Sequence, residues 1–429
     1  MFRNACLHCV SLVLICLSVA ASGADQDAAT TETLIAKLEP FWIPESLVVS
    51  ADGTRVACVA DVDGKQCVVV DGEAGAQYDR IGPEGVVVSV DGKRVGYAAS
   101  TGAPVASTGD EWFVVVDGEE GKHYASAGGL TFSPDGKRTA YVASTGAPVA
   151  STGGEWFVVV DGQEGKAYDG IVAGLGFSPD GTRVVHGAKM GDKQLMVVDG
   201  VEQKPYDGIP GFMFSPDGKT LVYGAAAGGE QFLVVNGEEG KHYKAVGGVV
   251  FSADGRKMAH VAGVDDQWLI VADGVEGKRY GGVGGPFLSP NGSRLAHAVV
   301  EDGKWYVLDN GKEGKRYDHV VAVFTFSPDG AKLAYVVGSR GNESVVVEGE
   351  QGKVYDGIDP RTLVFSPDSK TLAYAAELGG DQFVVINGRE GNPYDRILNA
   401  GKVVFDSPDS LHYLAVDGKE VYRVDERLE

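Results

Sequence analysis

The sequence predicts an all-β fold, a β-propeller of four-stranded antiparallel blades with about ten repeats. Three observations indicate this fold. A variant of Ser-Pro-Asp-Gly follows a short apolar run ten times, at intervals of 37 to 45 residues. Each interval holds four short strand-like segments separated by turn residues. Aromatic and small residues recur at fixed places in the units. The motif serines are Ser50, Ser89, Ser133, Ser178, Ser215, Ser252, Ser289, Ser327, Ser366 and Ser407.

The elements of one unit can be followed from Gly129 onward. An apolar strand leads into a turn in which Pro fixes φ and Gly permits a positive φ. Two further strands follow, the later one rich in β-branched residues, and an Asp-Gly turn leads to a short fourth strand. The expected segments are a first strand at 130–133, the turn at 134–136, a second strand at 138–143, a third strand at 156–160 and, after Asp161-Gly162, a fourth strand that ends at Asp169.

Columns within the repeat predict how the blades stack. Eight residues after the motif Ser stands Tyr or His in eight of nine units, whereas the opposite face of the same strand is mainly Ala, Val and Gly. A bulky face and a small face on each sheet favour stacking against copies of itself. The fourth strand carries a recurring Tyr, and Pro205 and Pro393 within it mark an edge strand. The bulky column is Cys58, Tyr97, Tyr141, His186, Tyr223, His260, His297, Tyr335 and Tyr374.

The last unit lacks one strand, because residues 403–425 supply only three before the chain ends. The segment 33–43 precedes the first motif and could supply the missing edge strand. We therefore expect one ring closed by an N-terminal strand. Two smaller propellers, or an open curved array, are the alternatives.

The N-terminus predicts export. Arg3 precedes an apolar stretch at 10–20, and small residues follow up to Ala24. This is the layout of a secretory signal peptide at 1–24, followed by a propeller repeat domain at 25–429. The expected location is periplasmic, cell-surface or extracellular, with no membrane insertion after signal cleavage. The formal net charge of -22 and the lack of any basic stripe make nucleic acid and anionic lipid unexpected partners.

Two cysteines remain after signal cleavage, Cys58 and Cys67, on either side of Asp61-Val62-Asp63-Gly64. They lie opposite each other if all four residues form the loop, and diagonally if only Asp63-Gly64 turn. An exported location favours a disulfide. The alternative is a pair of buried free thiols.

No catalytic, cofactor-binding or metal-binding residue is predicted. The chain has no Gly-x-Ser-x-Gly elbow, no phosphate-binding glycine loop and no His-Glu-x-x-His motif. Most of its aspartates recur in the repeat as turn residues. His186, His260 and His297 fall in the bulky packing column, and His123 and His242, just before fourth-strand tyrosines, are expected to be solvated.

A near duplicate provides the candidate binding patch. Residues 100–109 and 144–153 share the sequence Ser-Thr-Gly-Ala-Pro-Val-Ala-Ser-Thr-Gly and lie between the second and third strands of adjacent units. Long loops of small residues on a rigid sheet are common binding elements. The other explanation of these loops is a recent duplication of a neutral insertion. The residues of this patch are Pro104, Trp112, Pro148 and Trp156.

Phe-Ser-Pro-Asp-Gly-Lys followed by an apolar strand with a central Tyr, as in 132–141 and 326–335, resembles the TolB-like relatives of the WD-repeat propellers. The resemblance covers the chain from about residue 45 onward. It implies a propeller and, for function, a binding or scaffolding module, in some members periplasmic. The third strand ends in Val-Asp-Gly or Val-Asn-Gly and not in Trp-Asp, so the hydrogen-bond pattern of intracellular WD repeats is not expected.

The sequence thus favours an exported, non-enzymatic binding or scaffold protein, with loops or a central funnel that bind a protein or a glycan. One alternative is a polysaccharide-acting enzyme, a lyase or hydrolase with a site in the central channel. Another is a multivalent lectin that uses the recurring Tyr-Asp of the fourth strand. The identity of the ligand and the oligomeric state are left open by the sequence.

Overall fold

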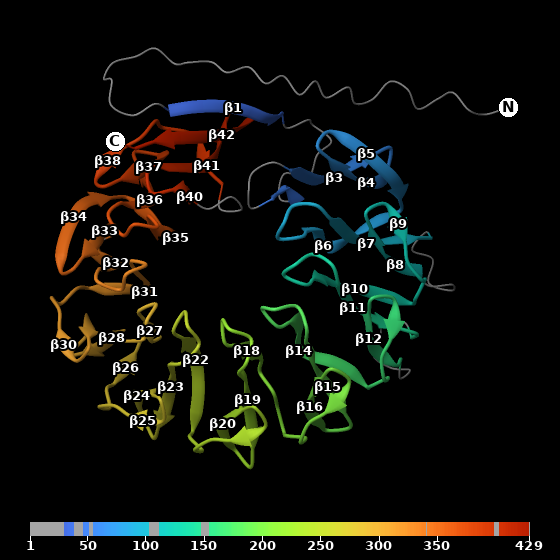
Figure 1. Cartoon of the computed structure of the whole chain (residues 1–429), viewed down its shortest axis with the longest axis horizontal. Helices are drawn as coiled ribbons and strands as arrows, with labels where there is room; N and C mark the ends of the chain where they lie inside the picture. Colours follow the sequence, from blue (N-terminus) through green and yellow to red (C-terminus); the bar gives the residue numbers. More distant parts are fainter. Residues whose placement is uncertain are drawn as a thin grey trace. The chain divides into compact units, whose positions relative to one another are not determined.

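The computed structural model describes residues 30–37, 46–50, 55–102, 111–146, 154–339, 341–398 and 403–428, which form ten antiparallel sheets (Figure 1). The described residues contain no α-helix, and none of them forms a helix of the length and apolar character needed to cross a membrane. This confirms the predicted all-β fold of four-stranded propeller blades. We number the blades 1 to 10 in chain order. The predicted signal peptide, Pro104 and Pro148 lie outside the described residues.

Within blades 1 to 9 the strands are hydrogen-bonded in chain order, first to fourth, whereas blade 10 takes its fourth strand, β1, from the start of the chain. The first strands are β2 (Val48–Val49), β6 (Arg80–Val88), β10 (Ser126–Phe132), β14 (Gly170–Phe177), β18 (Phe212–Phe214), β22 (Ala245–Phe251), β26 (Gly282–Val283) with β27 (Phe287–Leu288), β31 (His319–Phe326), β35 (Gly357–Phe365), and β39 (Arg396–Ile397) with β40 (Val404–Ser407). The second strands are β3 (Val56–Val62), β7 (Val95–Thr101), β11 (Thr139–Ser144), β15 (Val184–Met190), β19 (Leu221–Ala227), β23 (Met258–Val264), β28 (Leu295–Glu301), β32 (Leu333–Ser339), β36 (Leu372–Leu378) and β41 (Ser410–Asp417).

The third and fourth strands follow the same order. The third strands are β4 (Lys65–Val70), β8 (Glu111–Val116), β12 (Trp156–Val160), β16 (Lys193–Val198), β20 (Glu230–Val235), β24 (Gln267–Ala272), β29 (Lys304–Asp309), β33 (Asn342–Val347), β37 (Asp381–Ile386) and β42 (Glu420–Arg427). The fourth strands are β5 (Glu73–Tyr78), β9 (Glu119–Glu120), β13 (Gln163–Glu164), β17 (Val201–Glu202), β21 (Glu238–Glu239), β25 (Val275–Glu276), β30 (Lys312–Glu313), β34 (Glu350–Tyr355), β38 (Arg389–Glu390) and, in blade 10, β1 (Thr30–Lys37).

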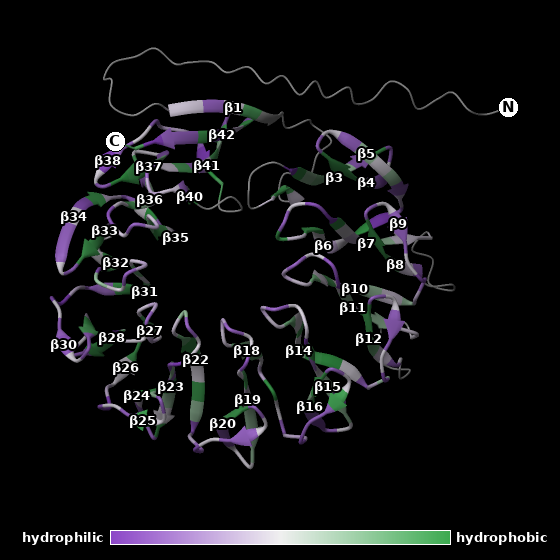
Figure 2. Ribbon diagram, in the orientation of Figure 1, coloured by the Kyte–Doolittle hydropathy of each residue, from purple (hydrophilic) through white to green (hydrophobic). Residues whose placement is uncertain are grey.

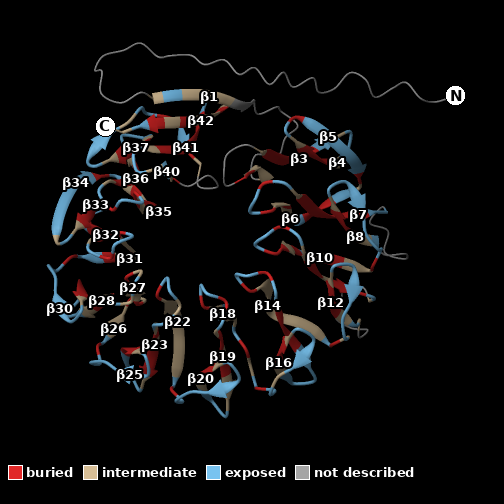
Figure 3. Cartoon of the chain, in the orientation of Figure 1, coloured by how far each residue is buried: buried red, intermediate tan, exposed pale blue. Residues whose placement is uncertain are grey.

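The core lies between neighbouring blades. Ala57 and Val59 of blade 1 share one buried cluster with Val95 and Tyr97 of blade 2. Blades 8 and 9 form an equivalent cluster. The second and third strands supply most of this core, whereas the fourth strands are exposed and hydrophilic, as β34 shows in Figures 2 and 3. The predicted stacking of bulky faces on small faces is therefore confirmed.

The Ser-Pro-Asp-Gly turn recurs because its serine is a buried hydrogen-bonding centre. Ser133 is fully buried, its Oγ donates to the Asp135 carboxylate at 2.6 Å, and it accepts the backbone N–H of Arg138 at 2.9 Å. Both contacts are local in sequence, so each unit can form its turn independently. The same Ser-to-Asp bond is made by Ser89, Ser178, Ser215, Ser252, Ser327, Ser366 and Ser407.

The turn between the third and fourth strands explains the Val-Asp-Gly pattern. Asp161 and Gly162 both have a positive φ, of 50° and 79°, as a two-residue type I′ hairpin turn requires. The Asp161 carboxylate also accepts the backbone N–H of Thr139 at 2.9 Å. Asp and Asn suit this position because they tolerate a positive φ and carry an acceptor.

Neighbouring blades are also joined by polar contacts. The Tyr124 hydroxyl and the Lys122 ammonium of blade 2 both bind Glu164 of blade 3, at 2.9 and 2.6 Å. Tyr206 and Tyr243 donate to Glu239 and Glu276 of the next blade in the same way. The fourth-strand tyrosine is therefore a structural residue.

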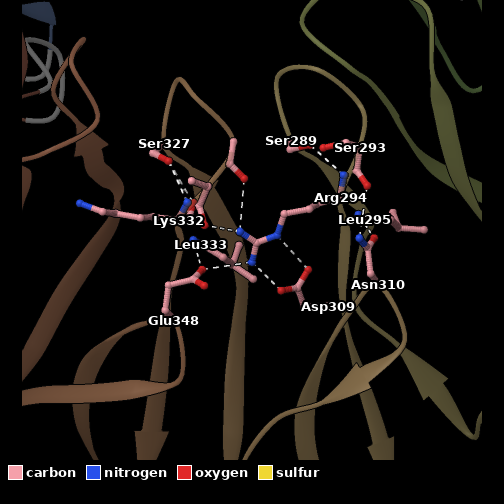
Figure 4. A network of polar contacts seen from close by, with 12 residues as sticks. Ser289, Ser293, Arg294, Leu295, Asp309, Asn310, Ser327, Lys332, Leu333 and Glu348 are labelled. Carbon is pink, nitrogen blue, oxygen red and sulfur yellow. Dashed lines mark hydrogen bonds and ion pairs between the residues drawn. The ribbon is translucent and has the colours of Figure 1, made fainter.

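An arginine five residues after the motif Ser forms a second bridge, which Figure 4 shows for Arg294. Its Nε donates to Asp309 of its own blade at 3.2 Å, and its Nη1 donates to the carbonyl oxygen of Gly330 in blade 8 at 3.2 Å. Its guanidinium also lies 5.2 Å from the Phe326 ring centroid. Sequence reasoning missed this role, although Arg recurs in the sequence at this position, as Arg55, Arg94, Arg138, Arg183 and Arg294.

The N-terminal strand β1 is the outermost strand of blade 10. The Glu32 carboxylate accepts the Tyr394 hydroxyl at 2.6 Å, the same bond that internal fourth strands make. Thr30 donates to the buried Glu426 at 2.8 Å. The predicted origin of the missing strand is confirmed, with its bounds at Thr30–Lys37 in place of 33–43.

The chain divides into two compact units. Residues 33–205 and 419–422 form the first unit, which holds blades 1 to 4. Residues 30–32, 206–418 and 423–428 belong to the second, which holds blades 5 to 9 and most of blade 10.

The candidate disulfide is not present. Cys58 and Cys67 are buried free thiols. Only Asp63 and Gly64 form the turn, so Cys58 pairs with Val69 and Cys67 with Ala60. This is the diagonal arrangement, whose Cα separation of roughly 7–8 Å exceeds what a disulfide spans without backbone movement. Burial, followed by the neighbouring Cys67, raises the pKa of Cys58 to about 12.

Candidate functional site

The candidate site is a cleft of about 510 Å³ in the second unit, lined by residues of blades 8, 9 and 10. Its walls come from β31, β33, β35, β36, β37 and β39, together with the turns next to them. It carries cationic and anionic side chains side by side. The charged or ionisable residues that line it are His319, Glu343, Asp356, Asp359, Arg361, Glu377 and Arg396.

An insertion in β35 forms one wall of the cleft. Asp359 pairs with Ala375 and Val364 with Ala373, so the residues 360–363 lie opposite Tyr374 alone. The bulge is held by Thr362, whose buried hydroxyl donates to the Asp359 carbonyl oxygen and accepts the Ala375 N–H, both at 2.7 Å. Pro360 suits this place because a bulge residue needs no ladder N–H.

The bulge presents a planar cation to the cleft. Arg361 is 69% exposed, and its Nε and Nη2 bind the two oxygens of Asp359 at 3.0 and 3.1 Å. This two-point contact orients the guanidinium while most of it remains accessible to a ligand.

His319 and Glu343 depart from their repeat columns, which in most other blades hold Gly, Ala or Ser and Gln or Trp, respectively. His319 stands opposite Gly338, and any side chain at Gly338 would overlap the imidazole ring. Glu343 takes the place held by Gln in other blades and accepts the Ile358 N–H at 2.8 Å. His319 Nε2 lies 4.0 Å from the Glu343 carboxylate.

Arg396 opens β39 at a position where several blades have Gly or Ala. It is exposed, and within the described part of the chain its guanidinium has no ion-pair partner. Two carboxylates nearby are already held: Asp356 accepts the Gly379 N–H at 2.8 Å, and Glu377 accepts from Gln382 at 3.2 Å. Arg396 is thus the cation of the cleft most available to an anionic group of a ligand.

The lining indicates recognition of polar, charged groups. The lining residues in the described part of the chain include no Ser, Cys or Thr that could act as a nucleophile and no Trp, Tyr or Phe on which a sugar ring could stack. The sequence alone did not predict this cluster. Its signal was present as departures from the repeat columns at His319, Glu343 and Arg396.

A second cluster, in blade 10, is an ion-pair network. Ligand atoms of Asp406, His412 and Asp425 lie within 4.8 Å of one another. The His412 Nδ1 bonds to Asp406 at 2.9 Å, and Arg423 binds Asp425 at 2.8 Å. Because the arginine already supplies a cation to this group, a metal ion would have to compete with it.

The predicted loop patch is only partly described. Trp112 and Trp156 are half-buried and form backbone bridges to Tyr124 and Tyr168. Trp112 also packs against the core between blades 2 and 3, and the guanidinium carbon of Arg80 lies 5.6 Å from the centroid of its ring. The two tryptophans therefore serve packing at least in part, and the binding patch with Pro104 and Pro148 stays a prediction.

The histidines are placed as follows. His186 and His260 are buried in the packing column, as predicted, and His297 also has a buried Nδ1. His123 and His242 are exposed, as predicted, and they also stack on Phe113 and Phe232 at 4.3 and 4.0 Å between ring centroids. They also bind Glu111 and Glu230, at 3.1 and 3.2 Å.

The Tyr-Asp motif of the fourth strand is explained by structure. The tyrosines of this column are buried, and the aspartates accept backbone N–H groups, as Asp79 does from Gly102 at 2.6 Å. Asp169, Asp207 and Asp395 make the same contact. The motif therefore gives no support to one lectin site per blade.

No family model matches this chain, and no curated protein matches it. Among solved structures it is similar to the Dos1 propeller, at 12% identity and a TM-score of 0.38, covering 69% of this chain and 91% of that one. It is also similar to the Cps50 (Swd1) β-propeller domain of Myceliophteria thermophila, at 10% identity and a TM-score of 0.31, covering 59% and 98%. A third similar structure is the dihydro-heme d1 dehydrogenase NirN in complex with DHE, at 16% identity and a TM-score of 0.34. The match covers 66% of this chain and 70% of that one. These similarities are too distant to indicate the function of this chain.

Proposed function

We propose that this chain is an exported, non-enzymatic binding protein of the TolB-like propeller kind, which binds a partner protein through the cleft of blades 8 to 10. The observation that carries the proposal is the departure from the repeat at this place. The column that supplies His319 and Arg396 holds Gly, Ala or Ser in most other blades, and Arg361 comes from the insertion in β35, so that all three side chains line one cleft here. The N-terminal layout at 1–24 and the Ser-Pro-Asp-Gly motif support export and the TolB-like kinship.

The chemistry of the cleft favours a protein partner over a glycan. A polar protein segment offers carboxylates for Arg361 and Arg396 and cationic groups for Asp359 and Glu377. A glycan site would be expected to offer an aromatic platform, which the lining residues of the described chain do not include.

A charge-reversal experiment tests the proposal. Arg396→Glu combined with Arg361→Ala should abolish capture of the partner from an extract of the source cells, because both accessible cations are lost. The matched control is Lys137→Glu with Lys219→Glu, at two lysines that are 80% and 83% exposed on turns outside the cleft. Quantitative mass spectrometry of the captured proteins provides the readout. Equal recovery of the same proteins by the cleft variant and the wild type would refute the proposal.

The duplicated loops are tested in the same assay. Deleting 103–109 and 147–153 together keeps the strand residues of β7 and β11, so it should leave the melting temperature nearly unchanged, because segments that join strands contribute little to the core. Loss of capture in this variant, with capture retained by the cleft variant, would move the binding surface to the predicted loop patch.

A polysaccharide-acting enzyme is the second candidate, and one observation favours it. His319 and Glu343 approach to 4.0 Å in a cleft with further carboxylates, an arrangement suited to acid-base chemistry. Incubation with a panel of acidic and neutral polysaccharides, with reducing-end release as the readout, distinguishes the two. Turnover that is lost in Glu343→Gln would establish the enzyme and overturn the binding proposal.

A further inference from the structure

A second cavity, of about 440 Å³, lies between blades 3 and 4 in the first unit. Its walls are mostly apolar and come from β12, β15 and β16, with Val158, Val160, Val184 and Val197 among the lining residues. Two polar side chains, Tyr168 and His186, complete the interior.

Both polar side chains are buried without a partner. Tyr168 is 6% exposed and His186 is 8% exposed. Within the part of the chain that the structure describes, neither the Tyr168 hydroxyl nor the His186 Nδ1 has a partner in hydrogen-bonding geometry, although burial and then the nearby Glu202 carboxylate raise the pKa of Tyr168 to about 12. A buried polar atom without a partner costs free energy, on the order of 1–3 kcal/mol, unless a water or a ligand satisfies it.

One residue of this contact differs from the equivalent contact between blades 2 and 3. At the equivalent contact between blades 2 and 3, Tyr124 faces Tyr141 and its hydroxyl donates to Glu164 at 2.9 Å. Between blades 3 and 4 the corresponding pair is Tyr168 and His186, with ring centroids 5.9 Å apart. An imidazole is shorter than a phenol, so space remains where the hydroxyl of a tyrosine would lie.

The charged residues around the cavity already have ion-pair or hydrogen-bond partners in the protein. Arg138 binds Asp161 at 2.9 Å, Lys166 binds Glu202 at 2.7 Å, and Asp199 accepts the Val184 N–H at 2.8 Å. Burial lowers the pKa of His186 to about 4, so its ring is neutral at pH 7. The interior therefore offers an apolar surface and two uncharged hydrogen-bonding atoms, and burying a charged ligand there would be unfavourable.

We propose that this cavity binds a small uncharged molecule with an apolar body and one hydroxyl group, of about the size of phenol. The hydroxyl of the ligand bonds to His186 Nδ1 and to the Tyr168 hydroxyl, while its body contacts the valines. The volume is within the range of ordinary small-molecule sites. This site lies in the first unit and is separate from the cleft of the proposed function, so either proposal can fail without the other.

Phenol is the probe that tests the site. Isothermal titration of the full mature chain should show saturable binding with one site, and crystals soaked in phenol should show the ring between blades 3 and 4. His186→Tyr should weaken binding at least tenfold, because tyrosine fills the space as it does at Tyr141 and Tyr223. The variant is expected to fold, since Tyr is the commonest residue of this column.

His260→Tyr is the matched control. It makes the same exchange in blade 6, where the facing Tyr243 hydroxyl is already satisfied by Glu276 at 3.0 Å. Phenol binding should be unchanged in this variant. Tyr168→Phe provides a second variant that keeps the size of the side chain but removes its hydroxyl, and it should weaken binding severalfold.

Four results would overturn the inference. They are the absence of saturable binding, equal binding by His186→Tyr, equal binding of benzoate and phenol, and soaked crystals that show only ordered water between Tyr168 and His186.

Discussion

Blades 2 and 9 each contain a four-residue bulge in the first strand, one register position apart, and use it differently. In both, four residues of the first strand lie opposite a single residue of the second, namely 82–85 opposite Ala98 and 360–363 opposite Tyr374. Each insertion contains a proline and borders a cavity, of about 300 Å³ in blade 2 and about 510 Å³ in blade 9.

The side chains make the difference. The blade 2 cavity has one charged residue, Glu84, among its described lining residues, whereas the blade 9 cleft combines Arg361 with charges from blades 8 and 10. The bulges are also stabilised differently. Blade 2 uses Gly85 at a φ of +72°, and blade 9 uses the Thr362 hydroxyl. The first strand of a blade therefore tolerates an insertion, and the exposed side chains of the insertion decide whether it can form a binding site.

The largest expected effect tests what the two blades share. Ser89→Ala and Ser366→Ala should each lower the free energy of unfolding by about 2–3 kcal/mol, because each leaves the backbone N–H of Arg94 or Thr371 without its partner. Urea denaturation followed by circular dichroism measures both. Ser293→Ala, at an exposed serine of a blade 7 turn, is the control and should change stability by less than about 0.5 kcal/mol. Unequal losses in blades 2 and 9 would show that the shared frame is not equivalent.

The next effect is specific to blade 9. Thr362→Val keeps the shape of the side chain but leaves the buried Ala375 N–H unsatisfied, so we expect a loss of about 2 kcal/mol. Urea denaturation again provides the measurement. Thr325→Val, in the first strand of blade 8, is the control. An unchanged midpoint for Thr362→Val would mean that the hydroxyl does not hold the bulge.

A smaller effect is specific to blade 2. Gly85→Ala should cost about 1 kcal/mol, because an alanine is strained at positive φ. No atom lies within 4 Å of the position a Cβ would take, so steric overlap adds nothing. Thermal unfolding measures the change. A loss several times larger would indicate that the whole bulge depends on this residue.

The smallest expected effect per residue is on stability at low pH. Ser89, then the backbone N–H and the side chain of Lys93, lower the pKa of Asp91 to about 2, and Ser366 acts likewise on Asp368. A lowered carboxyl pKa stabilises the fold above the ordinary value near 4, and this stability is lost as the pH falls toward 2. Melting temperatures of wild type and Asp91→Asn should therefore converge between pH 5 and 2. Asn291, which accepts from Ser289 at 2.9 Å, shows that the turn accommodates Asn. A difference that stays constant with pH would contradict the shift.

Much of the fold could be predicted from the sequence, and much less of the site. The motif Ser, the Asp-Gly hairpins and the bulky and small columns predicted the blades and their stacking, and the strand deficit of the last unit predicted the role of β1. The Cys58–Cys67 pairing could not be decided, because it depended on whether two or four residues turn. The cleft was missed because its residues come from three blades and no local motif contains them.

The sequence by itself determined the blade, because the bonds that define it join residues only two or five positions apart, as in Ser133, Asp135 and Arg138. Only the tertiary structure decided which departures from the repeat meet. His319, Arg361 and Arg396 line one cleft, and Tyr168 and His186 line one cavity, because side chains far apart in the chain are brought together when blades stack face to face.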